Sequence, residues 1–274
     1  MTAPDPSATP SRGITGDLSR LYDVFVDWPG RLARELPGIE RHLGAVGARR
    51  VLDAGCGTGR HVQALLERGY DAHGADLSHD QLAQAAELLD GHERLHHWRL
   101  GEPPSPTLLA AAPFDALICM GNVWPQVVDP GEAAAAARAF HQLVRPGGLV
   151  LLGLKAVGVR EPGGDPYMPL LKREHEGRPL WFVRFVDLTL PAREDGTRVA
   201  DFHMVVVAGD AGSAPEAAEA LLHRVSRVRA WSPGELEAWL SAQGFEDVRV
   251  SGRLDDPSSP PRGEDVFASM RVPG

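Results

Sequence analysis

The chain has 274 residues, a formal net charge of −9 and a 43% hydrophobic share that is ordinary for a globular protein. This length allows one large domain or two small ones with a sizeable core. The acidic balance argues against a general nucleic-acid or anionic-membrane surface. The sequence has no apolar run of about 18 residues, so no bilayer-spanning helix is predicted.

Residues 1–16 are expected to form a disordered tail. Met1 to Ser11 have neither the basic region nor the apolar region of a signal peptide. The two cysteines, Cys56 and Cys119, are expected as reduced side chains at strand ends and not as a disulfide framework. No Cys/His cluster has metal-site spacing, so no metal is expected. These features predict a cytoplasmic protein.

The first half of the chain alternates short apolar strands with helices. Two helices come first, Asp17–Trp28 and Arg31–Leu43, the second interrupted near Pro37. The strands then expected are Val51–Ala54, Ala72–Asp76, His96–Leu100, Phe114–Met120 and Leu149–Leu154, with intervening helices at His61–Arg68, Ser78–Asp90 and Asp129–Leu143. This alternation predicts βαβ units in a doubly wound parallel sheet. We take residues 17–156 as this core together with its N-terminal helices.

Residues 157–230 have a different pattern and are predicted to form an antiparallel insertion. Its expected elements are a short helix at Tyr167–Lys172, hairpin strands at Trp181–Leu190 and Arg198–Ala208, a helical or loop link at Ala214–Ala220 and a strand at Leu222–Ala230. Residues 231–274 are expected to complete the core sheet with a helix from Ser232 and strands at Asp247–Ser251 and Asp265–Arg271.

A glycine-rich turn follows the first predicted strand. Gly55, Gly57 and Gly59 alternate there, where backbone must bend sharply or approach a ligand closely. A dinucleotide fingerprint would need its third glycine at position 60, which is Arg60. The turn and the helix start that follows it form a cradle for a polar nucleotide-type ligand.

Two acids accompany this turn. Asp53 precedes Gly55 by two residues, and Asp76 closes the next strand 76 − 55 = 21 residues after Gly55. An acid at about this offset binds ribose hydroxyls in nucleotide-binding folds. The alternative interpretation is a tight turn with a surface aspartate.

Four stretches resemble successive motifs of the class I S-adenosylmethionine-dependent methyltransferases: Asp53–Gly59, Gly74–Ser78, Phe114–Leu117 and Leu143–Gly148. Cys119–Asn122, Tyr22–Asp23 and Trp28–Arg31 are similar to the glycine/sarcosine N-methyltransferase-like branch. The resemblance implies an α/β fold with a doubly wound, Rossmann-like seven-stranded sheet. Its order is 3-2-1-4-5-7-6 with the last strand antiparallel, and an inserted antiparallel β lid covers the substrate.

The resemblance also implies S-adenosyl-L-methionine as cofactor. Asp76 would hold the ribose hydroxyls, Leu77 would pack on the adenine, and Arg31 would pair with the cofactor carboxylate unless it is a solvated helix charge. The cofactor-binding residues expected are Tyr22, Trp28, Arg31, Asp53, Gly55, Cys56, Gly57, Gly59, Asp76, Leu77, Gln81 and Met120.

Substrate contacts are expected from Asn122, Trp124, Arg184 and His203, and Asn122 and His203 are also the catalytic candidates. Each has a plainer alternative, namely a turn cap for Asn122, core packing for Trp124 and a sheet-face position for the other two. The branch commonly has an Arg-Asn pair after the fifth strand, but here the residues are Leu154–Val157, which makes glycine itself a doubtful substrate.

The predicted function is methyl transfer by in-line displacement to a small molecule, with nitrogen favoured over oxygen by the resemblance alone. The alternatives are a small-molecule O-methyltransferase of secondary metabolism and a catalytically silent cofactor-binding protein on the same fold. A methyltransferase acting on RNA or protein is disfavoured by the acidic balance. Neither nucleic acid nor membrane is expected as a partner, and the oligomeric state stays open.

Overall fold

The computed structural model describes residues 17–159, 165–209, 219–261 and 265–274. Its helices are α1 (Asp17–Phe25), α2 (Trp28–Gly44), α3 (Arg60–Leu66), α4 (His79–Leu88), α5 (Pro106–Ala111), α6 (Pro130–Leu143) and α7 (Pro233–Ala242), with short 3-10 turns η1 (Trp124–Gln126) and η2 (Val157–Val159). Within these residues no helix is both long and apolar enough to cross a membrane. The predicted tail at 1–16 and positions 214–218 of the predicted link lie outside the described residues.

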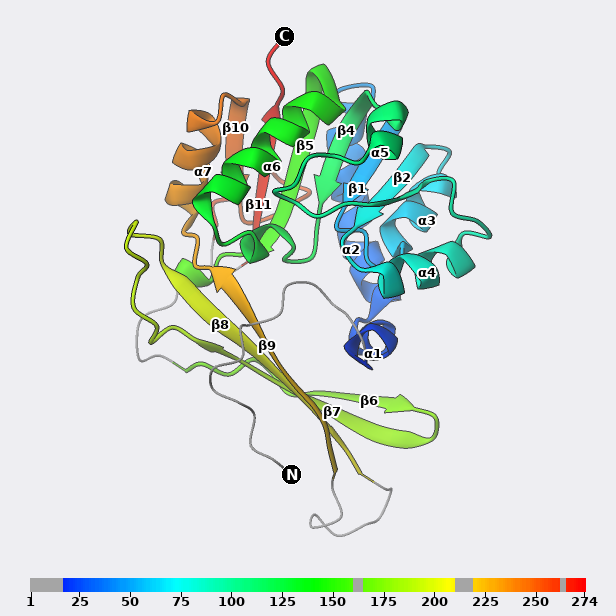
Figure 1. The fold of residues 1–274 in the computed structure, drawn as a ribbon, viewed down its shortest axis with the longest axis vertical. Coiled ribbons are helices and arrows are strands. Elements are labelled where there is room, and N and C mark those ends of the chain that lie inside the picture. Colours follow the sequence, from blue (N-terminus) through cyan, green and yellow to red (C-terminus); the bar gives the residue numbers. More distant parts are fainter. Residues whose placement is uncertain (1–16, 160–164, 210–218, 262–264) are drawn as a thin grey trace.

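A seven-stranded sheet forms the core (Figure 1). Its strands are β1 (Arg50–Ala54), β2 (Asp71–Asp76), β3 (Leu95–His97), β4 (Phe114–Cys119), β5 (Val144–Lys155), β10 (Glu246–Ser251) and β11 (Asp265–Arg271). The order is β3-β2-β1-β4-β5-β11-β10, and β11 is antiparallel to β5. Counted within this sheet the order is 3-2-1-4-5-7-6, so the predicted topology is confirmed.

Helices cover both faces of this sheet. Alternate residues of β1 point to opposite faces: Val51 joins a buried cluster with α2 and α3, and Leu52 joins one with α6. The inner strands therefore contact apolar side chains on both sides, which explains why β4 is an almost continuous apolar run.

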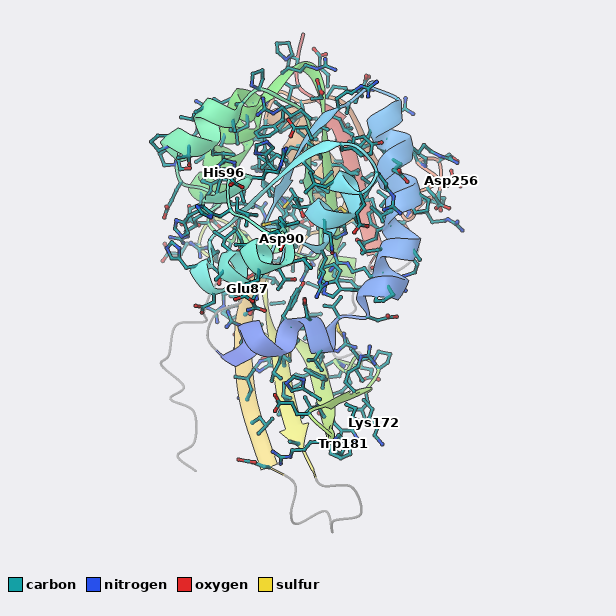
Figure 2. The ribbon with its side chains drawn as sticks, turned by 90° about the vertical axis from the view of Figure 1, so that its right-hand side faces the viewer. Glu87, Asp90, His96, Lys172, Trp181 and Asp256 are labelled. Atoms are coloured by element: carbon teal, nitrogen blue, oxygen red, sulfur yellow. The ribbon has the colours of Figure 1, made fainter. Side chains whose placement is uncertain are left out.

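A second, four-stranded antiparallel sheet is inserted between β5 and α7. Its strands, in spatial order, are β6 (Leu171–His175), β7 (Arg178–Asp187), β8 (Val199–Ala208) and β9 (Glu219–Arg229). One face of this small sheet packs on α1 through Leu21, Val24 and Phe25. Figure 2 shows α1 crossing between the core and the small sheet. The predicted antiparallel insertion is thus observed.

Two predicted features of the chain are wrong. The helix expected at Tyr167–Lys172 is absent, because Tyr167 instead bridges Phe185 and the next residues pair with β7 as β6. The interruption expected near Pro37 is also absent, since α2 is continuous through it. Pro37 removes one helix hydrogen bond, but buried neighbours on either side of it anchor the helix to the core.

Two short elements differ from the sequence-based expectation. The helix α5 was not predicted, although Ser105 caps its first turn and Pro106 occupies its first position. The third strand spans Leu95–His97 and ends before Leu100, and the chain then turns at Gly101 with φ +99°.

Candidate functional site

The glycine turn lies at the carboxyl end of β1 and takes a conformation that favours glycine. Gly55, Gly57 and Gly59 have φ of +83°, +57° and +79°. The amide of Gly55 donates to the carbonyl of Ala75 on β2, which fastens the turn to the neighbouring strand. A Cβ at Gly55 would come within 2.6 Å of the Val123 side chain, so the close approach also requires glycine.

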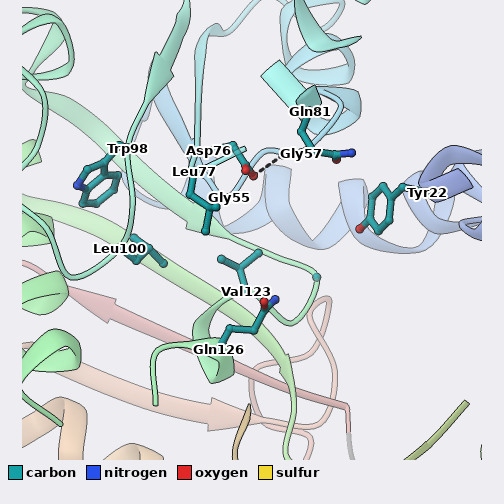
Figure 3. Close-up of a pocket in the computed structure, with 11 residues that line it drawn as sticks. Tyr22, Gly55, Gly57, Asp76, Leu77, Gln81, Trp98, Leu100, Val123 and Gln126 are labelled. Carbon is teal, nitrogen blue, oxygen red and sulfur yellow. Dashed lines mark hydrogen bonds between the residues drawn. The ribbon is translucent and has the colours of Figure 1, made fainter. Parts of the chain in front are cut away.

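Asp76 ends β2 beside this turn. Its carboxylate accepts a hydrogen bond from the backbone N–H of Gly57 at 3.0 Å (Figure 3). It accepts a second from the backbone N–H of Ser78 at 2.8 Å. Burial raises the pKa of Asp76, and these backbone bonds oppose the rise. The carboxylate is therefore held in one orientation at the mouth of the crevice between β1 and β2.

A pocket opens at this point, at the carboxyl ends of the parallel strands, where such folds bind ligands. The predicted residues that line it are Tyr22, Gly55, Gly57, Asp76, Leu77 and Gln81. Trp98, Leu100, Gly121, Val123 and Gln126 also line it and were not predicted (Figure 3). All five follow the ends of β3 or β4, so the strand-end rule applied to every strand would have found them.

Arg31 is held by Glu35 and by Trp28, both on its own helix. Its Nε donates to Glu35 Oε1 at 3.0 Å, and its guanidinium lies 5.0 Å from the Trp28 ring centroid. The second oxygen of Glu35 is 2.8 Å from His61 Nε2. Only 13% of the Arg31 side chain is exposed, so the solvated-charge alternative does not describe it.

The charge on Glu35 is stabilised by these contacts. Burial alone would raise the pKa of Glu35, but the hydrogen bond to His61 and the charge of Arg31 bring it below its usual value. A carboxylate that stays ionised keeps the Nε side of Arg31 fixed. The Nη2 atom of Arg31 then faces Gly121, where a Cβ would lie 2.8 Å away.

Asp53 is the most buried acid of the site. It is 2% exposed, and neither oxygen has a hydrogen-bond partner in the described part of the chain. The imidazole of His61 lies beside it, with Nδ1 4.0 Å from Asp53 Oδ2. Burial raises the pKa of Asp53 to about 6.

We expect Asp53→Asn to stabilise the protein at pH 7.5, without cofactor, by about 2–3 kcal/mol. The folded-state pKa is raised to about 6, so the contribution of Asp53 to stability is complete below the pKa of an exposed aspartate and is lost as pH rises through the folded value. Urea unfolding at a series of pH values should show the gap between variant and wild type widening from about pH 4 to about pH 6.5 and then levelling off. A gap that is constant with pH would contradict the assignment.

Asp23 joins four parts of the site and was not among the predicted residues. Its Oδ1 accepts from Trp28 Nε1 and from Thr58 Oγ1, both at 2.7 Å. Its Oδ2 accepts from Arg60 Nε at 3.0 Å and Nη2 at 2.6 Å. This one carboxylate therefore connects α1 to α2, to the glycine turn and to the start of α3. The resemblance pointed to the Tyr22–Asp23 pair but not to this role.

Four other predicted residues lie near the pocket without lining it. Asn122 has φ +68°, and its Oδ1 accepts from the Lys155 amide at 3.0 Å, which ties the end of β4 to the end of β5. Trp124 is 1% exposed in the core beside Phe140. Met120 and Cys56 are buried side chains next to the turn, and burial raises the pKa of the Cys56 thiol.

Arg184 and His203 lie on opposite faces of the small sheet. Arg184 pairs in register with Met204, which packs towards α1, and its guanidinium is 5.4 Å from the Phe25 ring centroid. His203 alternates with Met204 and so faces the other way, stacked on Phe185 at 4.4 Å. The structure does not bring these two candidates together.

Comparison with known proteins adds to this geometry. Residues 51–148 match the methyltransferase domain family. The glycine/sarcosine N-methyltransferase of Halorhodospira halochloris is 32% identical over 147 residues, 53% of this chain and 54% of that protein. The ubiquinone biosynthesis O-methyltransferase of Pseudomonas aeruginosa (strain UCBPP-PA14) is 32% identical over 177 residues, 60% of this chain and 70% of that protein. The chain spans about half the length of the glycine/sarcosine N-methyltransferases it matches.

A solved structure covers more of the chain. CalS10 from Micromonospora echinaspora, an amino pentose methyltransferase with S-adenosylmethionine bound, has a TM-score of 0.69 and 25% identity over 92% of this chain and 95% of that chain. The glycine turn and Asp76 lie within the residues that match the methyltransferase domain family. The chain belongs to the class I S-adenosylmethionine-dependent methyltransferases, and about half of it is similar to their glycine/sarcosine N-methyltransferase branch.

Proposed function

We propose that this protein transfers a methyl group from S-adenosyl-L-methionine to a nitrogen atom of a small-molecule acceptor. The observation that carries the proposal is the pocket at the ends of β1, β2 and β4, with the Asp76 carboxylate fixed at its mouth. When bound, the cofactor supplies an activated methyl group on a sulfonium, which a nucleophile displaces in line. The protein then has to orient the acceptor and exclude water.

The residues present fit this cofactor. Asp76 would accept hydrogen bonds from the ribose hydroxyls, and Leu77 would pack on the adenine beside it. Asp53 has two buried oxygens without partners, which suits a cationic ammonium group. Arg31 would bind the cofactor carboxylate through its Nη atoms, since its Nε is already bonded to Glu35.

Nitrogen is favoured because the pocket lining offers no evident general base. Among its described residues there is no histidine or lysine, and burial raises the pKa of Tyr22. An amine attacks in its neutral form, which an apolar site favours without a dedicated base. A hydroxyl acceptor needs its proton removed. The similarity to glycine/sarcosine N-methyltransferases and to CalS10 points the same way.

An O-methyltransferase is the second candidate, because the ubiquinone biosynthesis O-methyltransferase matches over 70% of its length. Turnover on a panel of small amines, amino sugars and phenols, with mass spectrometry and NMR of the products, separates the two. N-methylated products support the proposal, and products methylated only on oxygen replace it with the second candidate. Cofactor binding without turnover on the whole panel would instead favour the silent alternative.

We also propose that residues 157–230 form a lid over the acceptor, with 17–156 and 231–274 as the cofactor-binding core. The small sheet packs on α1, and α1 supplies Tyr22 to the pocket. Binding of the cofactor product should therefore slow hydrogen exchange in β7 and β8. Equal hydrogen-exchange rates in β7 and β8 with and without the cofactor product would contradict the proposed lid.

We expect Glu35→Gln to weaken cofactor binding about 5–30-fold while leaving the fold intact. The amide keeps the shape but loses the charge that fixes Arg31. Calorimetric titration with S-adenosylhomocysteine measures the effect. Glu40→Gln is the matched control, because Glu40 lies on the same helix and pairs with Arg68 at the surface, away from the site. Equal affinities of the two variants would show that Glu35 does not position Arg31.

A further inference from the structure

A buried histidine stands between two carboxylates of the site. His61 lies in the first turn of α3 and is 3% exposed. Its Nε2 is 2.8 Å from Glu35 Oε2 on α2, and its Nδ1 is 4.0 Å from Asp53 Oδ2 on β1. Glu35 is the carboxylate that fixes Arg31, and Asp53 is the one whose oxygens have no hydrogen-bond partner in the described part of the chain. The imidazole therefore connects both groups that face the amino-acid end of the cofactor.

The contact with Glu35 decides which nitrogen of the ring faces Asp53. Glu35 stays ionised, because the hydrogen bond to His61 and the charge of Arg31 bring its pKa below the usual value. An ionised carboxylate only accepts hydrogen bonds, so Nε2 of His61 donates to Glu35 and Nδ1 is left for Asp53. The Trp28 ring packs edge-on against the imidazole, with ring centroids 5.6 Å apart, which limits its rotation. Each nitrogen thus faces one carboxylate.

His61 also acts on the charge of Asp53. Burial raises the pKa of Asp53 to about 6, and the charge of His61 is the strongest influence that lowers it. In the described part of the chain, the other ionisable groups that interact with Asp53 are Arg31 and Glu35 from α2, Asp76 from β2 and the buried thiols of Cys56 and Cys119. A neutral side chain at position 61 leaves all of these in place and removes one favourable charge, so the pKa of Asp53 should rise.

We propose that His61 is a positioning residue for the amino-acid end of the cofactor. It holds Glu35, which fixes Arg31 for the cofactor carboxylate, and it keeps Asp53 ionised for the cofactor ammonium. It acts through these two side chains. The inference rests on the proposed function and adds to it a residue that the sequence motifs did not predict.

Calorimetric titration with two ligands tests this role. S-adenosylhomocysteine carries the amino-acid end, whereas 5′-methylthioadenosine has the same adenosine without it. At neutral pH, His61→Asn should weaken binding of S-adenosylhomocysteine about tenfold or more, because the asparagine amide is too short to reach Glu35. His61→Gln places its amide nitrogen where Nε2 was and should weaken this binding about threefold at most. Binding of 5′-methylthioadenosine should change less than about twofold in both variants.

The pH dependence of binding is a readout that a purely structural role would not move. Wild-type affinity for S-adenosylhomocysteine should fall as the pH drops through about 6, since protonated Asp53 no longer attracts the ammonium. Both His61 variants should move this midpoint to higher pH by about half a unit or more, because the favourable charge is gone. The charges of the ligand itself stay constant between about pH 5 and 7.

His141→Asn is the matched control. His141 is a half-buried histidine near the end of α6, on the other face of the sheet, with Nε2 3.1 Å from the Gln243 carbonyl oxygen. This variant should bind both ligands as wild type does. Glu35→Gln combined with His61→Asn should bind S-adenosylhomocysteine about as weakly as the weaker of the two single variants, because both act through Arg31.

The outcomes separate the role of His61 from the function beneath it. Failure of wild type to bind S-adenosylhomocysteine would overturn the proposed function. Equal weakening of both ligands, equal affinities of His61→Asn and His61→Gln for S-adenosylhomocysteine, or losses that multiply in the double variant would each overturn the role of His61 alone. If His61→Asn does not fold, the pH midpoint of His61→Gln tests the role, and a midpoint equal to that of wild type would overturn it.

Discussion

Asp76→Ala is expected to weaken binding of S-adenosylmethionine about 100-fold, the largest effect on affinity of any change in the pocket lining. The carboxylate would receive both ribose hydroxyls, and two charge-assisted hydrogen bonds of about 1.5 kcal/mol each amount to roughly 3 kcal/mol. The variant also releases the amides of Gly57 and Ser78, which now hold the turn against β2. Calorimetric titration gives the affinity directly.

Two further variants separate the loss of the acceptor oxygens at Asp76 from the loss of a negative charge. Asp76→Asn keeps one acceptor oxygen and should lie between wild type and Asp76→Ala. Asp80→Ala removes the same charge from the first turn of α4 and should bind like wild type. If Asp76→Ala bound S-adenosylmethionine with an affinity within twofold of wild type, Asp76 would not be a cofactor-binding residue.

Asp23→Ala should have the largest effect on stability, lowering the free energy of unfolding by about 2–4 kcal/mol. It leaves Trp28, Thr58 and Arg60 without the acceptor that they share. Because these residues lie on α2, the glycine turn and α3, cofactor affinity should fall together with stability. Urea unfolding and titration with S-adenosylhomocysteine measure the two effects.

Thr58→Val provides the graded comparison for Asp23→Ala. It removes one donor to Asp23 and keeps the salt bridge with Arg60, so it should cost about 1 kcal/mol. If Thr58→Val proved as damaging as Asp23→Ala, the effect would arise from packing at the turn, and the shared carboxylate would not be the cause.

The fold was predictable because its signals are local. The central strands of the core are short apolar runs, and the helices that begin after Ser78, Asp129 and Ser232 are capped by these side chains, which accept from the amide three residues on. The spacing of Gly55 and Asp76 follows from one βαβ unit, so this part of the pocket was predicted residue by residue. The interruption predicted at Pro37 was wrong because tertiary packing of α2 outweighs the local helix-breaking preference of proline.

The rest of the site depends on contacts between distant segments. Asp23 bonds to Arg60, which lies 37 residues further along the chain. The sequence around each of these residues has no pattern that predicts their pairing. Arg184 and His203 both looked able to enter a pocket, but strand register decides that only Arg184 faces α1. Single-sequence patterns give the period of a strand without saying which face is covered.

A crystal structure with S-adenosylhomocysteine is the measurement that most directly tests this account. The account predicts the ligand in the pocket between the glycine turn and Val123, with both ribose hydroxyls within hydrogen-bond distance of Asp76 and the carboxylate on Arg31. Electron density for the ligand elsewhere, or a ribose that does not contact Asp76, would contradict it.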